Sequence, residues 1–239
     1  MVKDRSRFVL AAAVSFFLLC FPPSLESAEI LFTDDFSSGS LEENWIFYGD
    51  PQPKVIDSLG FPPPCFNNNG DANGGSGIIS REVFPMEVGF FTECDVYFSC
   101  RERGTWVTPI MAIITPDFRN DDATFRDFMV AQMSLAYSGE LDWHCPHRQT
   151  IVYLHCMHDL ETKFIQQYYH QDQLSGGWHR LRMEIDAEKN VRYLMDDSLW
   201  AVSTVSIPDT LSSVRIKLGD RSSDWGIALH DNLRVGIAE

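Results

Sequence analysis

The stretch from Glu184 to Glu188 has the spacing E-x-D-x-E, which could place two carboxylates along one strand. Two carboxyl groups about 5–5.5 Å apart can cleave a glycosidic bond, one attacking and the other donating a proton. However, Asp186 opens the run "DAEKN", which has the composition of a turn, and apolar alternation resumes only at Val191. We therefore expect Glu188 to lie in the turn and to point away from Glu184, so that the two are not a catalytic pair.

Two short clusters, "HCPH" at 144–147 and "HCMH" at 155–158, hold four of the seven histidines. Imidazole and thiolate groups are good ligands for zinc or copper. A strand between the clusters would separate them by about 25 Å, so a shared metal site requires the chain to double back. A disulfide between Cys145 and Cys156 has the same requirement. We favour a third interpretation, in which the histidines lie on a solvent-facing strand edge.

A third candidate is "NGDANG" at Asn69–Gly74, in which Asn, Asp and Asn recur at every second position, as oxygen ligands do in a calcium-binding loop. The twelfth place, where such a loop carries a glutamate, is occupied by Ser80. Because the segment is flanked by "PPPCFNN" and "GSG", we favour a loop that binds no metal.

Aromatic side chains in weakly patterned segments are candidates for binding sugar. An exposed aromatic ring can stack on a sugar ring while Asn, Asp or Arg bond its hydroxyls. Taken singly, each such residue is more often part of a core than a ligand platform. The candidate carbohydrate-binding residues are Trp106, Trp143, Tyr168, Tyr169 and Trp225.

The beginning of the chain has the anatomy of a signal peptide. A charged stretch, "MVKDRSR", is followed by "FVLAAAVSFFLLCF" and then by "PPSLESA". The apolar run of about 14 residues is shorter than the roughly 20 that a bilayer needs. We therefore expect a signal peptide at 1–28 and a single domain at 29–239, secreted or placed in the periplasm or at the cell surface, with no transmembrane segment.

Cysteine usage and charge set further limits. Without Cys20 in the predicted signal peptide, an odd number of cysteines remains, so at least one is unpaired; these are Cys65, Cys94, Cys100, Cys145 and Cys156. Cys94 and Cys100 would lie about 20 Å apart on one strand, too far to bridge each other. The net charge of −15 argues against nucleic-acid binding and suits calcium or neutral sugars.

Short segments rich in Val, Ile, Phe and Tyr, separated by Gly, Asn, Asp and Pro, predict an all-β fold. The alternation is clearest where Leu181, Met183 and Ile185 share one face while Arg182 and Glu184 share the other. We find no internal repeat and no helical pattern of convincing length. Many short strands of this kind favour a sandwich of two antiparallel sheets.

The segments "FTDDFSSGSLEENW", "GWHRLRMEIDAEKNVRYLMDD" and "IALHDNLRV" follow one another along the chain. In this order they resemble the concanavalin A-like lectin/glucanase superfamily, which includes laminin-G-like domains and family 16 glycoside hydrolases. The resemblance covers both ends of the domain, and residues 50–175 match loosely. It implies a two-sheet jelly roll in which a closing strand near Ile227–Val235 pairs with an opening strand near Ile30–Phe36.

The same resemblance implies roles for individual residues. Trp45 and Trp178 correspond to positions that pack inside the sandwich. A structural calcium ion would bind where the end strands meet, with Asp35, Gly49 and Asp231 as its ligands. The alternative, that the acidic residues only cap edge strands, stays open.

Family 16 glycoside hydrolases carry their two glutamates on a mid-chain strand, before the "W-H" hairpin. Here the only E-x-D-x-E lies inside that hairpin. We therefore expect a non-catalytic, lectin-like carbohydrate-binding module whose partner is a polysaccharide or glycan. Two alternatives stay open: a glycan-cleaving enzyme with a different site, and a structural or adhesive surface domain.

Overall fold

The computed structural model describes residues 28–49, 52–68, 76–98, 109–117, 129–137, 150–157, 165–170, 177–220 and 228–238. Residues 68, 98, 136–137, 150–157, 165–170 and 220 are described by their backbone only. The predicted signal peptide lies outside these ranges except for Ala28. Within them, no helix is long and apolar enough to cross a membrane.

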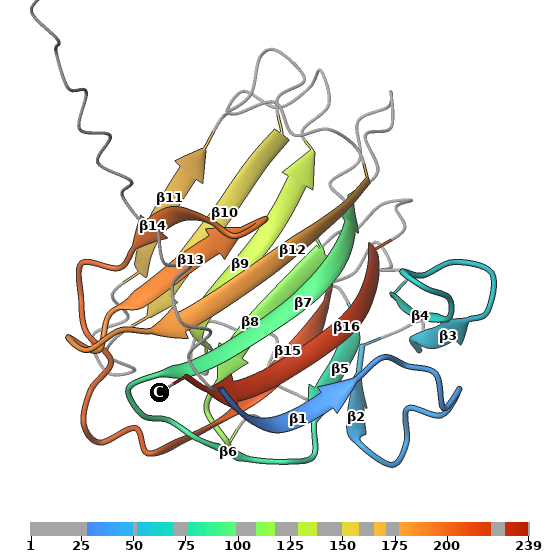
Figure 1. Cartoon of the computed structure of the whole chain (residues 1–239), viewed down its shortest axis with the longest axis horizontal. Helices are drawn as coiled ribbons and strands as arrows, with labels where there is room; N and C mark the ends of the chain where they lie inside the picture. The colour runs from blue at the N-terminus through green and yellow to red at the C-terminus, as the bar shows by residue number, and fades with distance from the viewer. Residues whose placement is uncertain are drawn as a thin grey trace, which may run out of the picture.

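The strands form two antiparallel sheets, which Figure 1 shows one in front of the other. Sheet A, the nearer, has the spatial order β14 (Ser198–Val202), β13 (Val191–Met195), β12 (Gly177–Ile185), β7 (Phe90–Phe98), β16 (Ala228–Ile237), β4 (Cys65–Asn68) and β3 (Lys54–Ile56), and β1 (Glu29–Asp34) also pairs with β16. Sheet B has the order β11 (Ile165–His170), β10 (Thr150–Met157), β9 (Met129–Tyr137), β8 (Pro109–Ile114), β15 (Ser213–Asp220), β5 (Gly77–Ser80) and β2 (Trp45–Tyr48), and β6 (Phe84–Pro85) also pairs with β15. The all-β sandwich predicted from the sequence is confirmed.

The first and last strands lie side by side, as the resemblance implied. β1 pairs antiparallel with β16, in a register that runs from Glu29 opposite Ile237 to Asp34 opposite Leu233. At the end of β1, the Asp34 carboxylate accepts hydrogen bonds from the Phe36 N–H at 2.8 Å and from the Trp45 indole at 2.7 Å. These bonds join the opening strand of sheet A to β2 of sheet B, and they explain why the opening motif carries both an aspartate and a tryptophan.

Strand alternation fills the space between the sheets. In β12, Leu181, Met183 and Ile185 are buried against the opposite sheet, whereas the intervening Arg182 and Glu184 face outward. Trp45, which is fully buried, packs in the same core and confirms its predicted place.

His230 is the unusual member of this interior. Its side chain is fully buried, its ring lies 5.3 Å from that of Phe66, and Nε2 donates a hydrogen bond of 3.1 Å to the Ile110 carbonyl of sheet B. Nδ1 has no hydrogen-bond partner in the part of the chain that the structure describes. Burial lowers the pKa of His230 to about 3, although the bond to the Ile110 carbonyl partly opposes this change.

Several strand ends meet at one end of the sandwich, the upper end in Figure 1. The backbone register shows that pairs of these ends lie beside one another: Phe98 pairs with Gly177, Asp220 with Pro109, Tyr137 with Thr150, and Asn68 with Ala228. The segments 69–75, 99–108, 138–149, 171–176 and 221–227 are bounded by such ends, and they themselves lie outside the described residues.

Candidate functional site

The acidic pair of the β12–β13 hairpin is separated by the structure. β12 ends at Ile185, and the Glu184 carboxylate is held by Arg182 at 2.9 Å and by Arg192 of the next strand. Glu188 is exposed in the turn, where its N–H donates to the Asp186 carboxylate. The prediction that Glu184 and Glu188 are not partners is confirmed.

An inner strand of sheet B, β9, is a mid-chain strand that precedes the β12–β13 hairpin. On β9, Gln132 pairs with Ala112 and Ser134 pairs with Ile110 of β8, so these four residues share the outer face. The outward positions in the middle of β9 therefore carry an amide and a hydroxyl, and neither is one of the two carboxyl groups that a retaining mechanism needs. Gln132 and Ser134 are both buried.

Apolar side chains surround Gln132 and Ser134 on this outer face. They form a second cluster, separate from the core between the sheets, and each is at most 3% exposed; its members are Tyr48, Ile79, Ile110, Ala112 and Ile114. Lys217, which pairs with Ala112 on the same face and is 5% exposed, holds its amine 4.7 Å from the centre of the Tyr48 ring. The described part of the outer face of sheet B is therefore buried, with polar as well as apolar side chains.

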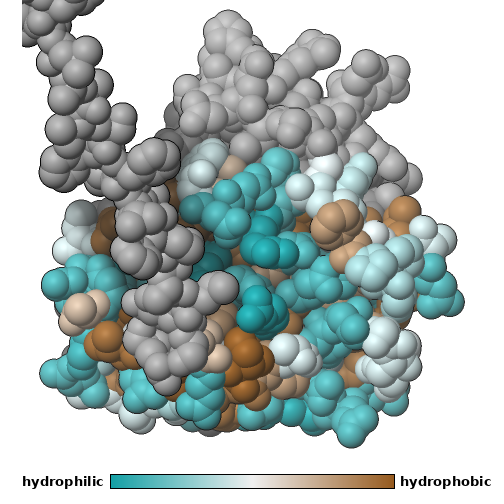
Figure 2. All heavy atoms as spheres, in the orientation of Figure 1, coloured by the Kyte–Doolittle hydropathy of each residue, from teal (hydrophilic) through white to brown (hydrophobic). Residues whose placement is uncertain are grey.

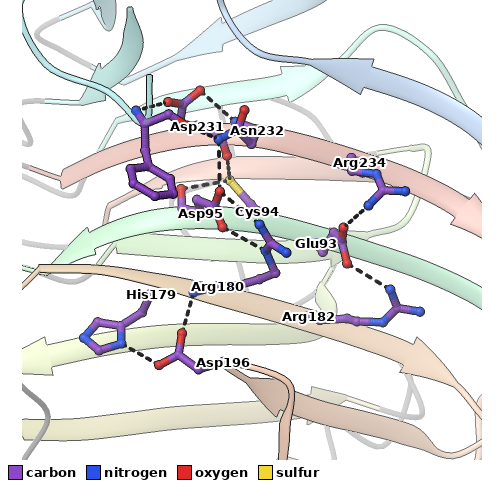
Figure 3. A network of polar contacts seen from close by, with 11 residues as sticks. Glu93, Cys94, Asp95, His179, Arg180, Arg182, Asp196, Asp231, Asn232 and Arg234 are labelled. Atoms are coloured by element: carbon purple, nitrogen blue, oxygen red, sulfur yellow. Dashed lines mark hydrogen bonds and ion pairs between the residues drawn. The ribbon is translucent and has the colours of Figure 1, made fainter. Parts of the chain in front are cut away.

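The outer face of sheet A is different, because charged side chains cover its middle. Figure 2, in the orientation of Figure 1, shows hydrophilic residues gathered there. Figure 3 shows how they alternate in sign across the strands. We refer to the following residues as the charge network: Glu93, Asp95, Arg180, Arg182, Glu184, Arg192 and Arg234.

Two carboxylates of the charge network are buried although they lie on an outer face. Glu93 is 5% exposed and accepts hydrogen bonds from Arg182 at 2.9 Å and from Arg234 at 2.8 Å. Asp95 is 4% exposed and accepts a bond of 3.0 Å from Arg180, whose pKa this bond raises. Removing Arg180 would leave the buried Asp95 without its cation, and removing Arg182 or Arg234 would leave the buried Glu93 with one cation instead of two; both changes are costly. These carboxylates therefore hold strands β7, β12 and β16 together.

Beside Asp95, a β-bulge in β16 brings two neighbouring side chains onto the backbone of Phe61. Asn232 has a φ of 50°, and the register shifts between Asp231 and Arg234. The Asp231 carboxylate accepts the Phe61 N–H at 2.6 Å, and the Asn232 amide donates to the Phe61 carbonyl at 2.6 Å. We call Asp231 and Asn232 the Phe61 clamp (Figure 3). Burial raises the pKa of Asp231, although the N–H groups of Phe61 and Asn232 oppose this effect.

The clamped Phe61 belongs to a group of three rings, which we call the aromatic platform: Phe61, Trp178 and Tyr97. The Phe61 and Trp178 rings are 6.4 Å apart with an angle of 27° between them, and Tyr97 meets Trp178 edge-on at 5.6 Å. Phe61 is 60% exposed, and Trp178 and Tyr97 are partly buried.

The prediction that Trp178 packs inside the sandwich is therefore wrong. Trp178 pairs with Tyr97, and it lies two residues before Arg180 on the same strand face. Because His179 and Leu181 take the inward positions, Trp178 must point outward with the arginines.

The predicted calcium ligands provide oxygen donors, as calcium requires. Asp231 is buried, and this burial raises its pKa, with a smaller contribution from the negative charge of Asp35. In the structure, the Asp35 carboxylate accepts the Ser37 N–H, and the Gly49 carbonyl accepts the Gln52 amide. Hydrogen bonding from the side chain of Ser37, and then from its backbone, lowers the pKa of Asp35. The described residues contain no group of three or more His, Cys, Asp or Glu side chains placed to hold a metal. Calcium binding at Asp35, Gly49 and Asp231 stays a prediction.

Cys65 and Cys94, the two cysteines whose side chains the structure describes, are free and buried, and Cys156 is described by its backbone in β10. Burial raises the pKa of Cys65 to about 12, and it also raises the pKa of Cys94, whose thiol donates to the Asp231 carbonyl at 3.2 Å. Neither is a reactive thiolate at neutral pH. Cys100, Cys145 and the loop Asn69–Gly74 lie outside the described residues.

Most of the other predicted site residues also fall outside the described ranges. This applies to Trp106, Trp143 and Trp225 and to the histidines at 144, 147 and 158. Tyr168 and Tyr169 are in β11, where their backbones pair with Leu154 and Tyr153. The sequence analysis missed Phe61, Tyr97 and Asn232. The bulge that places Asn232 has no signal in the sequence pattern, whereas the alternation Trp178-x-Arg180 could have indicated the outward tryptophan.

Comparison with known proteins bears on the fold. No protein-family model matches the chain, and no curated protein matches its sequence. Solved structures do match: a family 16 glycoside hydrolase endo-glucanase from Bacteroides ovatus has a TM-score of 0.57 at 12% identity, covering 86% of this chain and 100% of that one. The catalytic domain of an endo-1,3-β-glucanase (laminarinase) from Thermotoga petrophila has a TM-score of 0.58 at 11% identity, covering 90% and 100%.

A third match comes from a carbohydrate esterase of a Shiga toxin-encoding bacteriophage, with a TM-score of 0.56 at 11% identity, covering 89% of this chain and 100% of that one. At these identities the similarity concerns the fold. Together with the two antiparallel sheets and the paired end strands, it shows that this protein has the concanavalin A-like jelly-roll fold.

Proposed function

We propose that this protein is an exported carbohydrate-binding, lectin-like module that cleaves no glycan. The observation that carries the proposal is the middle of β9, where Gln132 and Ser134 take the outward positions. Neither side chain can act as nucleophile or as general acid in a glycosidase mechanism.

The acidic residues elsewhere on the described sheets agree with this interpretation. Glu93, Asp95 and Glu184 are each held by at least one arginine, and Asp231 accepts two backbone N–H groups. These contacts give the four carboxylates structural roles in the sheets. A catalytic pair would have to lie in other parts of the chain.

A glycan ligand is supported by the fold and by the candidate aromatic residues. The solved structures with the same fold include two glucanases and a carbohydrate esterase. Trp106, Trp143 and Trp225 belong to segments whose flanking strand ends lie at one end of the sandwich. The proposal assigns the stacking on sugar rings to these three and to Tyr168 and Tyr169.

The test measures binding and cleavage on the same samples. We expect the protein to bind at least one polysaccharide on a glycan array and to release no reducing sugar from it. Alanine at Trp106, Trp143 or Trp225 should weaken binding, whereas Leu199→Ala, at an exposed apolar position of β14, should not. Release of reducing sugar would show an enzyme, and absence of binding to any glycan would favour a structural or adhesive domain.

A further inference from the structure

Phe61 combines two properties that rarely occur together, exposure and rigidity. Its side chain is 60% exposed, the highest value among the exposed large hydrophobic residues of the described chain. Its backbone N–H and carbonyl are both bound by side chains, those of Asp231 and Asn232, at 2.6 Å each. Two hydrogen bonds are thus used to fix a residue whose ring remains in solvent.

The loop around Phe61 restricts it further. Gly60 has a φ of +146°, and a Cβ added there would lie 2.6–2.8 Å from backbone atoms of Pro62, Pro63 and Pro64. Only glycine fits this close turn, and the three prolines that follow Phe61 have restricted φ angles. The loop is therefore preorganised, and a ligand that contacts Phe61 pays little ordering entropy.

Phe61 is also part of a surface rather than an isolated apolar side chain. Its ring lies 6.4 Å from that of Trp178, which in turn contacts Tyr97. Single exposed apolar residues need no explanation, but fixed rings that adjoin one another are typical of binding sites.

Polar groups border the aromatic platform. Arg180 lies two residues from Trp178 on the same face of β12, and its side chain is 44% exposed. Its Nε and Nη2 point to Asp95, while Nη1 takes part in no hydrogen bond within the described part of the chain. A guanidinium held at one side in this way can donate to a hydroxyl group at the other.

We propose that the aromatic platform is a second carbohydrate-binding site, which stacks on an uncharged sugar ring while Arg180 donates to one of its hydroxyls. It lies on sheet A and does not require that the segments bearing Trp106, Trp143 and Trp225 bind sugar. Arg180 is already paired with the Asp95 carboxylate, and the Asp231 carboxylate, which accepts the Phe61 N–H, adds a second negative charge next to the platform, so the local charge disfavours uronic acids and sulfated sugars.

A peptide partner fits this surface less well. Peptides that bind jelly-roll or other sheets in extended form usually add to a free edge. Here β12, β7 and β16 are each paired on both sides. An apolar peptide would also leave the donor of Arg180 without a partner, whereas a sugar hydroxyl satisfies it.

The test follows the indole N–H signal of Trp178 by NMR, assigned with the Trp178→Phe variant, while the whole protein is titrated with oligosaccharides. The panel contains neutral gluco-, manno- and xylo-oligosaccharides, acidic oligogalacturonides and a proline-rich peptide. We expect at least one neutral sugar to move the Trp178 signal and the acidic sugars to leave it unchanged. Phe61→Ala should weaken that binding by roughly two- to tenfold, the range given by the loss of one aromatic contact.

Matched variants separate this site from the proposed function. Leu199→Ala removes an apolar side chain that is 50% exposed on the same sheet and should leave the titration unchanged. Trp143→Ala should lower overall glycan binding without altering the response of Trp178. The proposal is overturned if no neutral sugar moves the Trp178 signal, if only the peptide or the acidic sugars move it, or if Phe61→Ala binds as tightly as the wild type.

Discussion

The buried imidazole of His230 should make the protein lose stability in mild acid. The ring lies between the two sheets, where Nε2–H donates to the Ile110 carbonyl and burial lowers the pKa to about 3. In the unfolded chain the same imidazole titrates near its ordinary value of 6.5. Between these two values the unfolded state binds a proton that the folded state does not bind.

The sign and size of the effect follow from this difference. Stability rises with pH wherever the unfolded state binds more protons, so the contribution of His230 is complete above about pH 6.5 and is lost as the pH falls toward 3. Each pH unit in this window is worth about 1.4 kcal/mol. At pH 4.5, two units below the unfolded value, His230 should therefore destabilise the fold by about 3 kcal/mol, a large share of the 5–15 kcal/mol that is typical of a domain.

The assay is urea unfolding at constant ionic strength between pH 4.5 and 7.5, for the wild type and two variants. His230→Gln keeps an N–H donor for the Ile110 carbonyl without titrating, and His230→Phe keeps a ring beside Phe66. Both variants should be less stable than the wild type at pH 7.5, by about 1 kcal/mol for the changed hydrogen bond. Both should lose the steep fall below pH 6.5. Parallel pH profiles for the wild type and the variants would refute the reasoning, because all other titrating groups are common to the three proteins.

Three further predictions concern packing, metal and charge. Gly77→Ala should lower the free energy of unfolding by about 1–3 kcal/mol in urea, because the added Cβ would lie 2.1 Å from the Leu218 carbonyl; a change below about 0.5 kcal/mol would contradict this. Calcium should raise the melting temperature of the wild type, chelator should reverse the rise, and Asp231→Ala should abolish it; a wild type that is insensitive to calcium ends that proposal. Glu184→Gln should lower the free energy of unfolding by about 1 kcal/mol in the same urea assay, because the carboxylate holds Arg182 and Arg192. Glu188→Gln, in the turn, should change neither stability nor glycan binding, and equal effects of the two substitutions would contradict the separation of the two residues.

The strand pattern and the terminal motifs were sufficient to predict the architecture. Alternation in β12 follows directly from Leu181, Met183 and Ile185, because a strand with one face against a core must repeat every second residue. The pairing of β1 with β16 followed from a resemblance that covers both ends of the chain. The turn at Asp186 was predictable because local composition determines turns.

The site was harder to predict, because its residues come from segments that are distant in sequence. Phe61 meets Trp178 only because Asp231 and Asn232 bind its backbone. These two residues are 170 and 171 positions away from Phe61 in the sequence. Such contacts depend on a β-bulge and on sheet order, and neither leaves a periodic signal. Trp178 was placed in the core because the resemblance assigns its position to the inside of the sandwich, yet the register with Tyr97 turns it outward.

The outer faces of the two sheets differ in their side chains, and this difference makes sheet A the better candidate for a binding surface. Sheet B carries apolar side chains such as Ile79, Ile110 and Ile114, which are almost completely shielded. Sheet A carries carboxylates that are just as buried, but arginines hold them, and at one end of this rigid network three rings remain accessible. The ion pairs of the charge network restrain the strands and so hold Trp178 and Arg180 in a fixed geometry. Weakly binding ligands such as sugars require such a geometry, because their binding free energy is too small to order a mobile site. If that rigidity matters, Arg182→Leu, which breaks the network without touching the aromatic platform, should weaken the response of Trp178 to sugar as well as the stability of the sheet.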